Sequence, residues 1–407
     1  MQKACFWSAS GLMAAERGPL FFLVAGEPSG DMLAARIMRA LKEETGGAIR
    51  FAGTGGPLMR EEGLESLIDI REVAYVGLAE VLPHIPRVLY LIRKVAKAAR
   101  AAKPDLYCSI DAPGYGLRVA RALRHEPFPR VHCVSPSVWA WKPWRAKQMA
   151  GYLDHVLTLL PFEPPYFTRH GLDATFFGHP SVEAAALAAP DPAELRQRLG
   201  IAPETPLITL MPGSRRAEVN RLIPVLAETM KLLKERLPDV QAIVPTVPSV
   251  AALVQEQLAG FPIPVHILMG EADRRSAYAA SRVAIAKSGT VGLELAIAGL
   301  PAVIIYKVDN ISAAIFRRIV RVQWSSVASL VLGRLVQPEC LQENCTPEKI
   351  MAALDPLLVD GPARRRVIED GREAALKLGM GQYRPSQNAA RLLLSLLPAG
   401  KAPGGTP

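Results

Sequence analysis

Several residues suited to chemistry lie in a short glycine-containing turn between two apolar runs. The turn, residues 287–290, follows residues 283–286, which predict a buried parallel strand, and precedes an apolar-periodic helix that ends at residues 299–301. Such a helix N-terminus attracts a phosphate, because its first N–H groups lack helical partners and its dipole is positive there. Glu294 is spaced to reach a ribose hydroxyl, although an ordinary βαβ unit with a surface Glu would show the same pattern. The predicted nucleotide ligands are Lys287, Ser288, Gly289, Thr290 and Glu294.

A second turn of this kind carries arginine. Residues 207–210 predict a strand, residues 211–218 form the turn, and a helix is expected through residue 233. Arginine can bind a phosphate through two parallel hydrogen bonds, so this pattern indicates a phosphate site more strongly than glycine alone. The predicted ligands here are Gly213, Ser214 and Arg215.

Carboxylates follow two predicted strands in the first half of the chain. Glu27, Ser29 and Asp31 come after the strand at residues 20–25, and Asp111 ends the strand that begins near residue 105. Carboxylates at the ends of parallel strands face the ligand crevice, where a general base would be placed. Two simpler roles remain open: Ser29 or Asp31 could cap the next helix, and Asp111 before Ala-Pro could be a turn former.

A tryptophan-rich loop follows the strand at residues 131–134. Three tryptophans alternate with cations in residues 135–147, which is a pattern that could stack nucleic-acid bases. Nucleic-acid binders usually spread such residues along a sheet or groove, so we expect this loop to line a sugar or acyl site instead. Its candidate contacts to such a site are Ser137, Trp139 and Trp141.

The composition is that of a globular protein with an anionic partner. The chain has 407 residues and a net charge of +10, from 48 Lys and Arg against 38 Asp and Glu. Its 5 cysteines are scattered and form no C-x-x-C pair, so neither a disulfide framework nor a zinc site is expected, and a reducing compartment, most simply the cytosol, is indicated. No clean G-x-G-x-x-G motif is present, which disfavours a nicotinamide or flavin enzyme. We therefore expect no metal and no cofactor.

Alternating strands and helices predict an α/β fold of two Rossmann-like domains that face one another across a central crevice. The expected divisions are an N-terminal extension (1–18), an acceptor-side domain (19–182), a nucleotide-binding domain (183–365), C-terminal helices returning to the first domain (366–397) and a disordered tail (398–407). No run approaches the roughly 20 apolar residues of a membrane-spanning helix. We expect neither a secretory signal nor a transmembrane segment.

The segment from Val73 to Ala102 combines an apolar half with a basic half. Residues 73–85 are apolar with almost no charge, and residues 87–100 predict a basic amphipathic helix. A core-packing helix with a solvated basic face explains this pattern. Docking on anionic lipid explains it as well.

Seven short runs in the same order along the chain resemble the lipid-A-disaccharide synthase family of inverting GT-B glycosyltransferases, and the resemblance covers roughly residues 20–395. The family joins UDP-2,3-diacylglucosamine to 2,3-diacylglucosamine 1-phosphate (lipid X) in lipid A biosynthesis of Gram-negative bacteria, at the inner face of the inner membrane. The matching runs are residues 26–31, 110–113, 135–141, 177–180, 212–215, 287–290 and 338–342.

The resemblance implies roles for particular residues. The family's essential aspartate falls on Asp111 and its essential arginine on Arg215, and Glu27 and Asp31 are rivals for the catalytic base. The residues expected on the acceptor side are Ser29, Asp31, Ser137, Trp139 and Trp141. Gln342, at the end of the last matching run, joins the predicted donor-binding residues. The chain departs from the family at Pro28, which replaces Ala, at residues 114–116, where Gly-Tyr-Gly replaces a more polar loop, and at Ser329, which stands where the family has Asn.

The partners that the resemblance implies are the two lipid substrates, an anionic membrane surface and, as one option, a second copy of the chain in a homodimer, with no nucleic acid. A UDP-N-acetylglucosamine 2-epimerase is the alternative enzyme, because it also uses two Rossmann-like halves and a ribose-binding Glu. A nucleic-acid-binding protein is the alternative from another class, suggested by the basic charge and the tryptophan loop.

Overall fold

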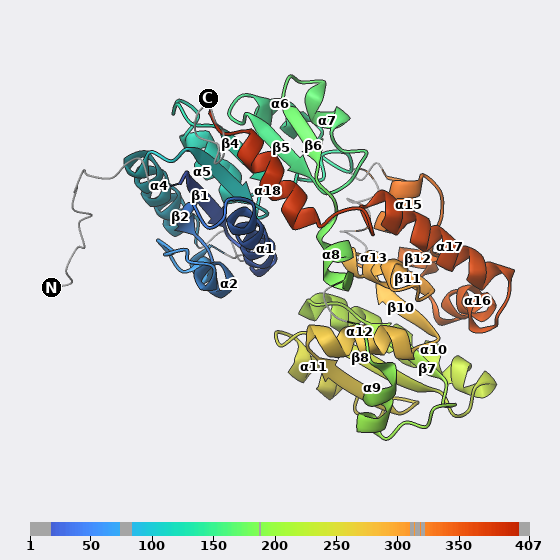
Figure 1. Ribbon diagram of the computed structural model, residues 1–407. Coiled ribbons are helices and arrows are strands. Elements are labelled where there is room, and N and C mark those ends of the chain that lie inside the picture. Colours follow the sequence, from blue (N-terminus) through green and yellow to red (C-terminus); the bar gives the residue numbers. More distant parts are fainter. Residues whose placement is uncertain are drawn as a thin grey trace.

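The computed structural model describes residues 18–73, 84–186, 189–309, 313, 318 and 322–398. Two parallel sheets, each with six strands, are covered by helices and form two lobes (Figure 1). The predicted fold class, two Rossmann-like halves of the α/β type, is confirmed. The N-terminal extension and almost all of the C-terminal tail lie outside the described residues.

The first sheet has the strand order β2-β1-β3-β4-β5-β6 with every pair parallel. The central strands β1 and β3 are mostly apolar and buried, because helices cover both faces of the sheet. The strands are β1 (Leu20–Ala25), β2 (Arg50–Thr54), β3 (Leu106–Ile110), β4 (Arg130–Cys133), β5 (His155–Thr158) and β6 (Asp173–Phe176).

Side-chain alternation divides the core of this domain between two faces. Phe21 and Leu23 pack on one side with α1, whereas Phe22 and Val24 pack on the other side with the helices that follow β2, β3 and β4. The helices of this domain are α1 (Pro28–Glu44), α2 (Pro57–Glu61), α4 (Ile85–Ala102), α5 (Gly116–Ala122), α6 (Trp144–Ala150) and α7 (Pro165–Thr168), with a short 3-10 turn, η1 (Ile70–Glu72).

The second sheet has the order β12-β11-β10-β7-β8-β9 and is also entirely parallel. Its strands are β7 (Leu207–Met211), β8 (Gln241–Thr246), β9 (Val265–Met269), β10 (Val283–Lys287), β11 (Ala302–Tyr306) and β12 (Glu339–Leu341). The helical elements around it are α9 (Pro192–Leu199), α10 (Arg216–Arg236), α11 (Ala251–Gln257), α12 (Glu271–Ala280), α13 (Thr290–Ile297), α15 (Val327–Leu332), η3 (Gln342–Asn344), α16 (Pro347–Leu358) and α17 (Pro362–Lys377).

The chain crosses between the domains twice, and the two crossings are bonded to each other. It leaves the first domain through α8 (Pro180–Ala186) and returns through α18 (Pro385–Ser395). The backbone N–H and the hydroxyl of Ser386 donate to the buried carboxylate of Glu183, at 2.9 and 2.5 Å. Nearby, the N–H of His179 donates to the carbonyl of Leu378 at 3.1 Å. These bonds join the outgoing and returning segments into one connection.

Of the C-terminal helices in the described ranges, α18 alone packs against the first sheet's helix α1. Figure 1 shows α18 lying beside α1, and Arg391 and Gln387 of α18 bond Glu44 at the end of α1. By contrast, α17 packs on α13, α15 and α16 of the second domain. The expectation that residues 366–397 pack back as a unit is therefore corrected, because the apolar face of α17 (Ala374, Ala375) is buried in the second domain.

The sequence analysis offers residues 73–85 as an apolar segment that could meet a membrane. Residues 74–83 of this segment lie outside the described residues. Within the described ranges, no helix has the length and apolar character needed to cross a bilayer.

We predict that Leu393→Ala in α18 destabilises the protein by about 2–5 kcal/mol, because Leu393 is fully buried in the core shared with α1 and its loss leaves a cavity. The check is urea unfolding followed by tryptophan fluorescence. The matched control is Leu376→Ala in α17, whose side chain is 43% exposed and should change stability by no more than about 0.5 kcal/mol. Equal effects of the two substitutions would contradict the packing of α18.

Candidate active site

Each sheet has one point where the chain reverses its direction of winding, and the predicted site residues lie at these two points. In the first sheet the chain moves from β1 to β2 and then to β3 on the other side of β1. In the second sheet it moves from β7 through β8 and β9, and then to β10 on the other side of β7. Loops at such a point leave in opposite directions and open a crevice beyond the carboxyl ends of the strands.

Asp111 lies at this crevice in the first domain and is oriented by Ser29. The Ser29 hydroxyl donates to Asp111 Oδ2 at 2.6 Å, which joins the first turn of α1 to the loop after β3. A short hydrogen bond to a carboxylate holds its direction as well as its position. The structure therefore brings together two of the residues predicted to act on the acceptor side.

The backbone around Asp111 is strained. Asp111 and Ala112 both adopt left-handed conformations, with φ angles of 53° and 43°. Non-glycine residues rarely occupy this region, and they persist there only when their surroundings hold them. Gly30 provides part of this support, because a Cβ on Gly30 would lie 2.9 Å from the carbonyl oxygen of Ile110 and 3.3 Å from the Asp111 Cβ. The start of α1 thus packs directly against the end of β3.

The pKa of Glu27 is shifted by charged groups of both domains. Burial raises the pKa of Glu27 above its usual value, the Asp111 carboxylate raises it further, and the Arg215 guanidinium lowers it. Arg215 belongs to the loop after β7 in the second domain, so charges from both domains act on the Glu27 carboxyl. Between α1 and α8 on one side and α12 and α13 on the other, a cavity of about 250 Å³ opens.

Asp31 has a different role from the one expected. Its buried carboxylate accepts hydrogen bonds from the N–H groups of Gly56, Leu58 and Met59, at 2.7, 3.1 and 3.1 Å. It therefore caps the N-terminus of α2, and the alternative that Ser29 or Asp31 caps α1 is wrong. The residue at the cap position of α1 is Glu27, without a side-chain cap bond. With three backbone donors already bound, Asp31 holds the α1–α2 corner together.

The tryptophan loop divides into an inward and an outward part. The Trp139 indole N–H, its only donor, bonds Glu163 at 2.9 Å, and its ring meets the edge of Phe162. Trp139 thus has a packing role. Trp141 is 40% exposed with the Lys142 ammonium over its ring, and Ser137 is exposed as well.

The two predicted phosphate turns meet at the crevice of the second domain. A cavity of about 190 Å³ lies beyond the ends of β7 and β10. The residues predicted from the two turns that line it are Gly213, Ser214, Lys287, Gly289, Thr290 and Glu294. The Arg215 side chain stands beside it at the start of α10 and is 64% exposed.

A carboxylate that the sequence analysis did not select, Glu218, joins these two turns. Its Oε2 accepts from the N–H groups of Ser214 and Arg215 at 3.1 and 3.3 Å, and its Oε1 lies 3.0 Å from Lys287 Nζ. The expected bare N–H groups of this turn are therefore partly occupied already. A signal was present, because Glu218 stands three residues after the helix cap, the position of a capping-box glutamate.

Glu294 lies at the back of this cavity and has two partners from α12. Its carboxylate accepts from the Tyr278 hydroxyl at 3.3 Å and lies 3.5 Å from Arg274 Nε. Burial raises the pKa of Glu294, although Arg274 and Tyr278 oppose this shift by stabilising the charged form. The partners hold the carboxylate at the position from which a ribose contact was predicted.

Ser288 and Gln342, the remaining residues predicted to bind the donor substrate, contact other residues of the second domain. The Ser288 N–H donates to Ile305 O at 2.8 Å, and Gln342, at the end of β12, accepts from Val308 N–H at 3.2 Å. Ser329 is buried and accepts from Val336 N–H at 3.0 Å, so it organises the chain between α15 and β12.

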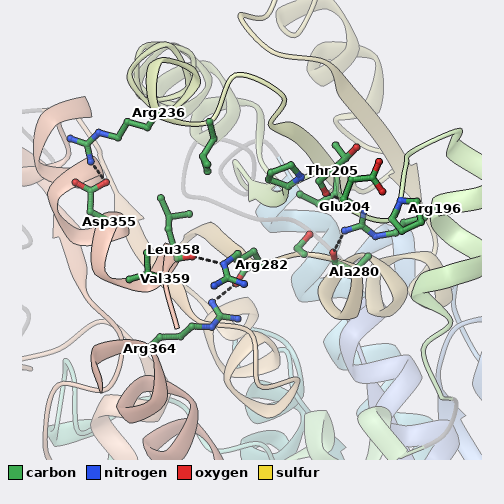
Figure 2. Close-up of a pocket in the computed structure, with 15 residues that line it drawn as sticks. Arg196, Glu204, Thr205, Arg236, Ala280, Arg282, Asp355, Leu358, Val359 and Arg364 are labelled. Carbon is green, nitrogen blue, oxygen red and sulfur yellow. Dashed lines mark hydrogen bonds and ion pairs between the residues drawn. The ribbon is translucent and has the colours of Figure 1, made fainter. Parts of the chain in front are cut away.

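A larger cavity of about 820 Å³ lies near the amino ends of β7 and β10, on the opposite side of the second sheet from the predicted site (Figure 2). It is lined by residues at the starts of β7 and β10; Arg236 pairs with Asp355, and the other three lining arginines donate to backbone carbonyls. Arg196 donates to Ala280 O, Arg282 to Leu358 O and Arg364 to Arg282 O. None of the predicted site residues lines it.

The fold of the chain is similar to that of several solved proteins, one of them determined with UDP. It matches the S. aureus MnaA–UDP structure with a TM-score of 0.63 at 12% identity, covering 93% of this chain and 97% of that one. It also matches Acinetobacter baumannii MurG with a TM-score of 0.57 at 15% identity, covering 93% and 99%. Together with the paired loops at the sheet edges, this similarity shows a two-domain α/β fold of the GT-B type.

Comparison of sequences is more specific. The family model described as lipid-A-disaccharide synthetase matches residues 21–391. The lipid-A-disaccharide synthase of Rhodospirillum centenum is 47% identical over 380 residues (93% of this chain, 94% of the relative), and that of Paramagnetospirillum magneticum is 42% identical over 386 (94% and 98%). The chain belongs to the lipid-A-disaccharide synthase family.

Proposed function

We propose that the chain transfers 2,3-diacylglucosamine from UDP-2,3-diacylglucosamine to lipid X with inversion, giving the β-1,6-linked lipid A disaccharide 1-phosphate and UDP. The family supports the reaction class. The observation that carries the mechanism is that Asp111, held by Ser29, ends β3 in the first domain, whereas Arg215 and Lys287 stand at the ends of β7 and β10 in the second. An acceptor-side carboxylate and a donor-side cation on opposite walls are what a direct displacement needs.

In this proposal Asp111 is the general base. It takes the proton from the acceptor 6-hydroxyl while that oxygen forms a bond to the anomeric carbon of the donor. The bond from the anomeric carbon to the phosphate oxygen breaks, and UDP leaves with the electron pair. Ser29 orients Asp111 for this step through its 2.6 Å hydrogen bond. Glu27, beside Asp111, is assigned to orienting the acceptor.

The donor loops supply the charge that stabilises the leaving UDP. The Arg215 guanidinium and the Lys287 ammonium stand at the ends of β7 and β10, where the diphosphate of a nucleotide sugar would lie. Preorganised cations at the site of developing negative charge lower the barrier without a metal ion. We therefore propose a metal-independent enzyme.

The reaction is tested by incubating the purified protein with both lipids and measuring UDP and disaccharide by mass spectrometry. We expect turnover that depends on both lipids and persists in excess EDTA, because arginine and lysine replace the metal. Activity lost with EDTA and restored by Mg²⁺ would refute metal independence. Interconversion of UDP-N-acetylglucosamine and its 2-epimer, followed by NMR, without any disaccharide, would establish the epimerase alternative.

We predict that Asp111→Asn abolishes turnover but leaves UDP affinity within a few fold, because it removes the base without changing the donor loops. Arg215→Ala should weaken UDP binding by about 1.5–3 kcal/mol through loss of a charge-assisted contact. Calorimetric titration with UDP and the disaccharide assay separate the two effects. Asp173→Asn, an exposed aspartate in β6, is the control and should retain activity. Near-native turnover of Asp111→Asn together with an inactive Glu27→Gln would make Glu27 the base.

We further propose that the first domain docks peripherally on the cytoplasmic face of the inner membrane, where both lipid substrates reside. In α4, Leu89 and Tyr90 are 40% and 55% exposed, and Arg93 and Lys97 are exposed on the same helix. An aromatic and an aliphatic side chain beside cations match the interface of an anionic bilayer.

The corresponding prediction is that the protein sediments with vesicles containing anionic phospholipid at low salt and is released at high salt, because salt screens the charges. Replacing Arg93 and Lys97 together by Glu should reduce binding by about tenfold or more, at about 1 kcal/mol for each cation near the surface. The control is Arg372→Glu, an exposed arginine on α17 of the second domain. Binding that ignores vesicle charge and salt would contradict the proposal.

A further inference from the structure

Glu218 occupies the place where the two phosphate turns meet. It projects from the first turn of α10, and its side chain is 11% exposed. One carboxylate oxygen accepts from two N–H groups in the loop after β7, and the other pairs with Lys287 at the end of β10. Arg215 adds a weaker contact, with its Nη1 3.5 Å from Glu218 Oε1. A single side chain thus links the ends of β7 and β10, the two strands between which the second sheet reverses its direction of winding.

The backbone of the turn is shaped around this carboxylate. Gly213 has a φ of 119°, and a Cβ at that position would lie 2.6 Å from Glu218 Oε2. Glycine is therefore required twice, for its conformation and for the space that the carboxylate fills. The turn and Glu218 form one packed unit.

Capping of the helix accounts for only part of this arrangement. A capping-box glutamate bonds the N–H of the residue at the cap position, which here is Arg215. The pairing with Lys287 contributes nothing to α10, because Lys287 comes from a different strand 69 positions later in the chain. Its ammonium also lies 5.7 Å from the Tyr306 ring, at the end of the adjacent strand β11. Glu218 and Tyr306 together determine where the lysine charge stands.

We propose that Glu218 is a positioning residue of the donor site, which holds the Lys287 ammonium and the turn at residues 213–215 in the geometry that binds a diphosphate. The inference rests on the proposed use of a UDP-sugar donor. The inference predicts the direction in which UDP affinity changes when the Glu218 charge is removed. A carboxylate near a diphosphate repels it, so if Glu218 had no positioning role, neutralising it would make the protein bind UDP more tightly. If Glu218 is a positioning residue, neutralising it makes the protein bind UDP more weakly.

The variant that tests this is Glu218→Gln, which keeps the size and one oxygen acceptor but loses the charge that holds Lys287. Calorimetric titrations with UDP and with uridine, for the variant and the unmodified protein, are compared. We expect the Kd for UDP to rise about tenfold and the Kd for uridine to stay within twofold, because uridine has no phosphate. Unchanged or tighter UDP binding would overturn the inference, and an equal loss for uridine would show a merely structural role.

A double substitution tests whether Glu218 acts through the lysine. Lys287→Gln should weaken UDP binding, and adding Glu218→Gln should change it by no more than twofold further, because the positioned charge is already gone. Independent, multiplying losses would overturn the inference. Glu228→Gln, on the exposed side of the same helix and paired with Lys231, is the matched control and should bind UDP normally.

Two further measurements keep the outcomes distinct. Glu218→Asp keeps the charge but is one methylene too short to reach both turns, so the same UDP-selective loss is expected if Glu218→Gln fails to fold. If Glu218→Asp binds UDP normally, the inference is wrong. If the unmodified protein binds no UDP at all, the proposed donor is wrong and the inference falls with it. Normal UDP binding by the unmodified protein and by Glu218→Gln refutes only the inference.

Discussion

The winding of two all-parallel sheets is the constraint on which the rest of the structure depends. A parallel sheet built outward in both directions from its first strand has one edge position where neighbouring loops separate. In each domain the first strand, β1 or β7, borders that position. The proposed base and its orienting serine occupy the first such position, and the two turns proposed to bind phosphate occupy the second. A two-domain enzyme of this class therefore needs only to point these two edges at each other.

The two domains use the same device to hold their edges in place. In the first, the Asp31 carboxylate accepts three N–H groups and joins the starts of α1 and α2. In the second, the Glu218 carboxylate accepts two N–H groups and a lysine and joins the turns after β7 and β10. A buried carboxylate is costly unless its oxygens are bonded, so each one enforces the geometry of its donors. Both are structural anions placed one helical turn or less from the proposed chemistry.

The sequence was informative where a local pattern decides the structure. Apolar runs followed by glycine turns predicted the strands and the phosphate loops, because strand burial and turn conformation depend on neighbouring residues. Partners that are distant in sequence were less accessible. Asp31 looked like the cap of its own helix but caps α2, 25 or more positions away. Trp139 looked like a ligand contact, yet its indole N–H satisfies Glu163. The packing of α17 on the second domain likewise depends on which apolar face meets which, and an amphipathic pattern alone does not specify that partner.

The return of α18 to the first domain has a consequence for synthesis of the chain. The apolar face of α1, with Ile37, Met38 and Leu41, is completed by residues of α18 such as Ala390 and Leu393. More than two hundred residues separate the end of β6 from the start of α18, so the ribosome needs roughly 10–40 s to reach it at about 5–20 residues per second. During this interval the first domain has all its strands but an open hydrophobic flank. The second domain can close its own core meanwhile, and the half that is translated first is the last to be finished.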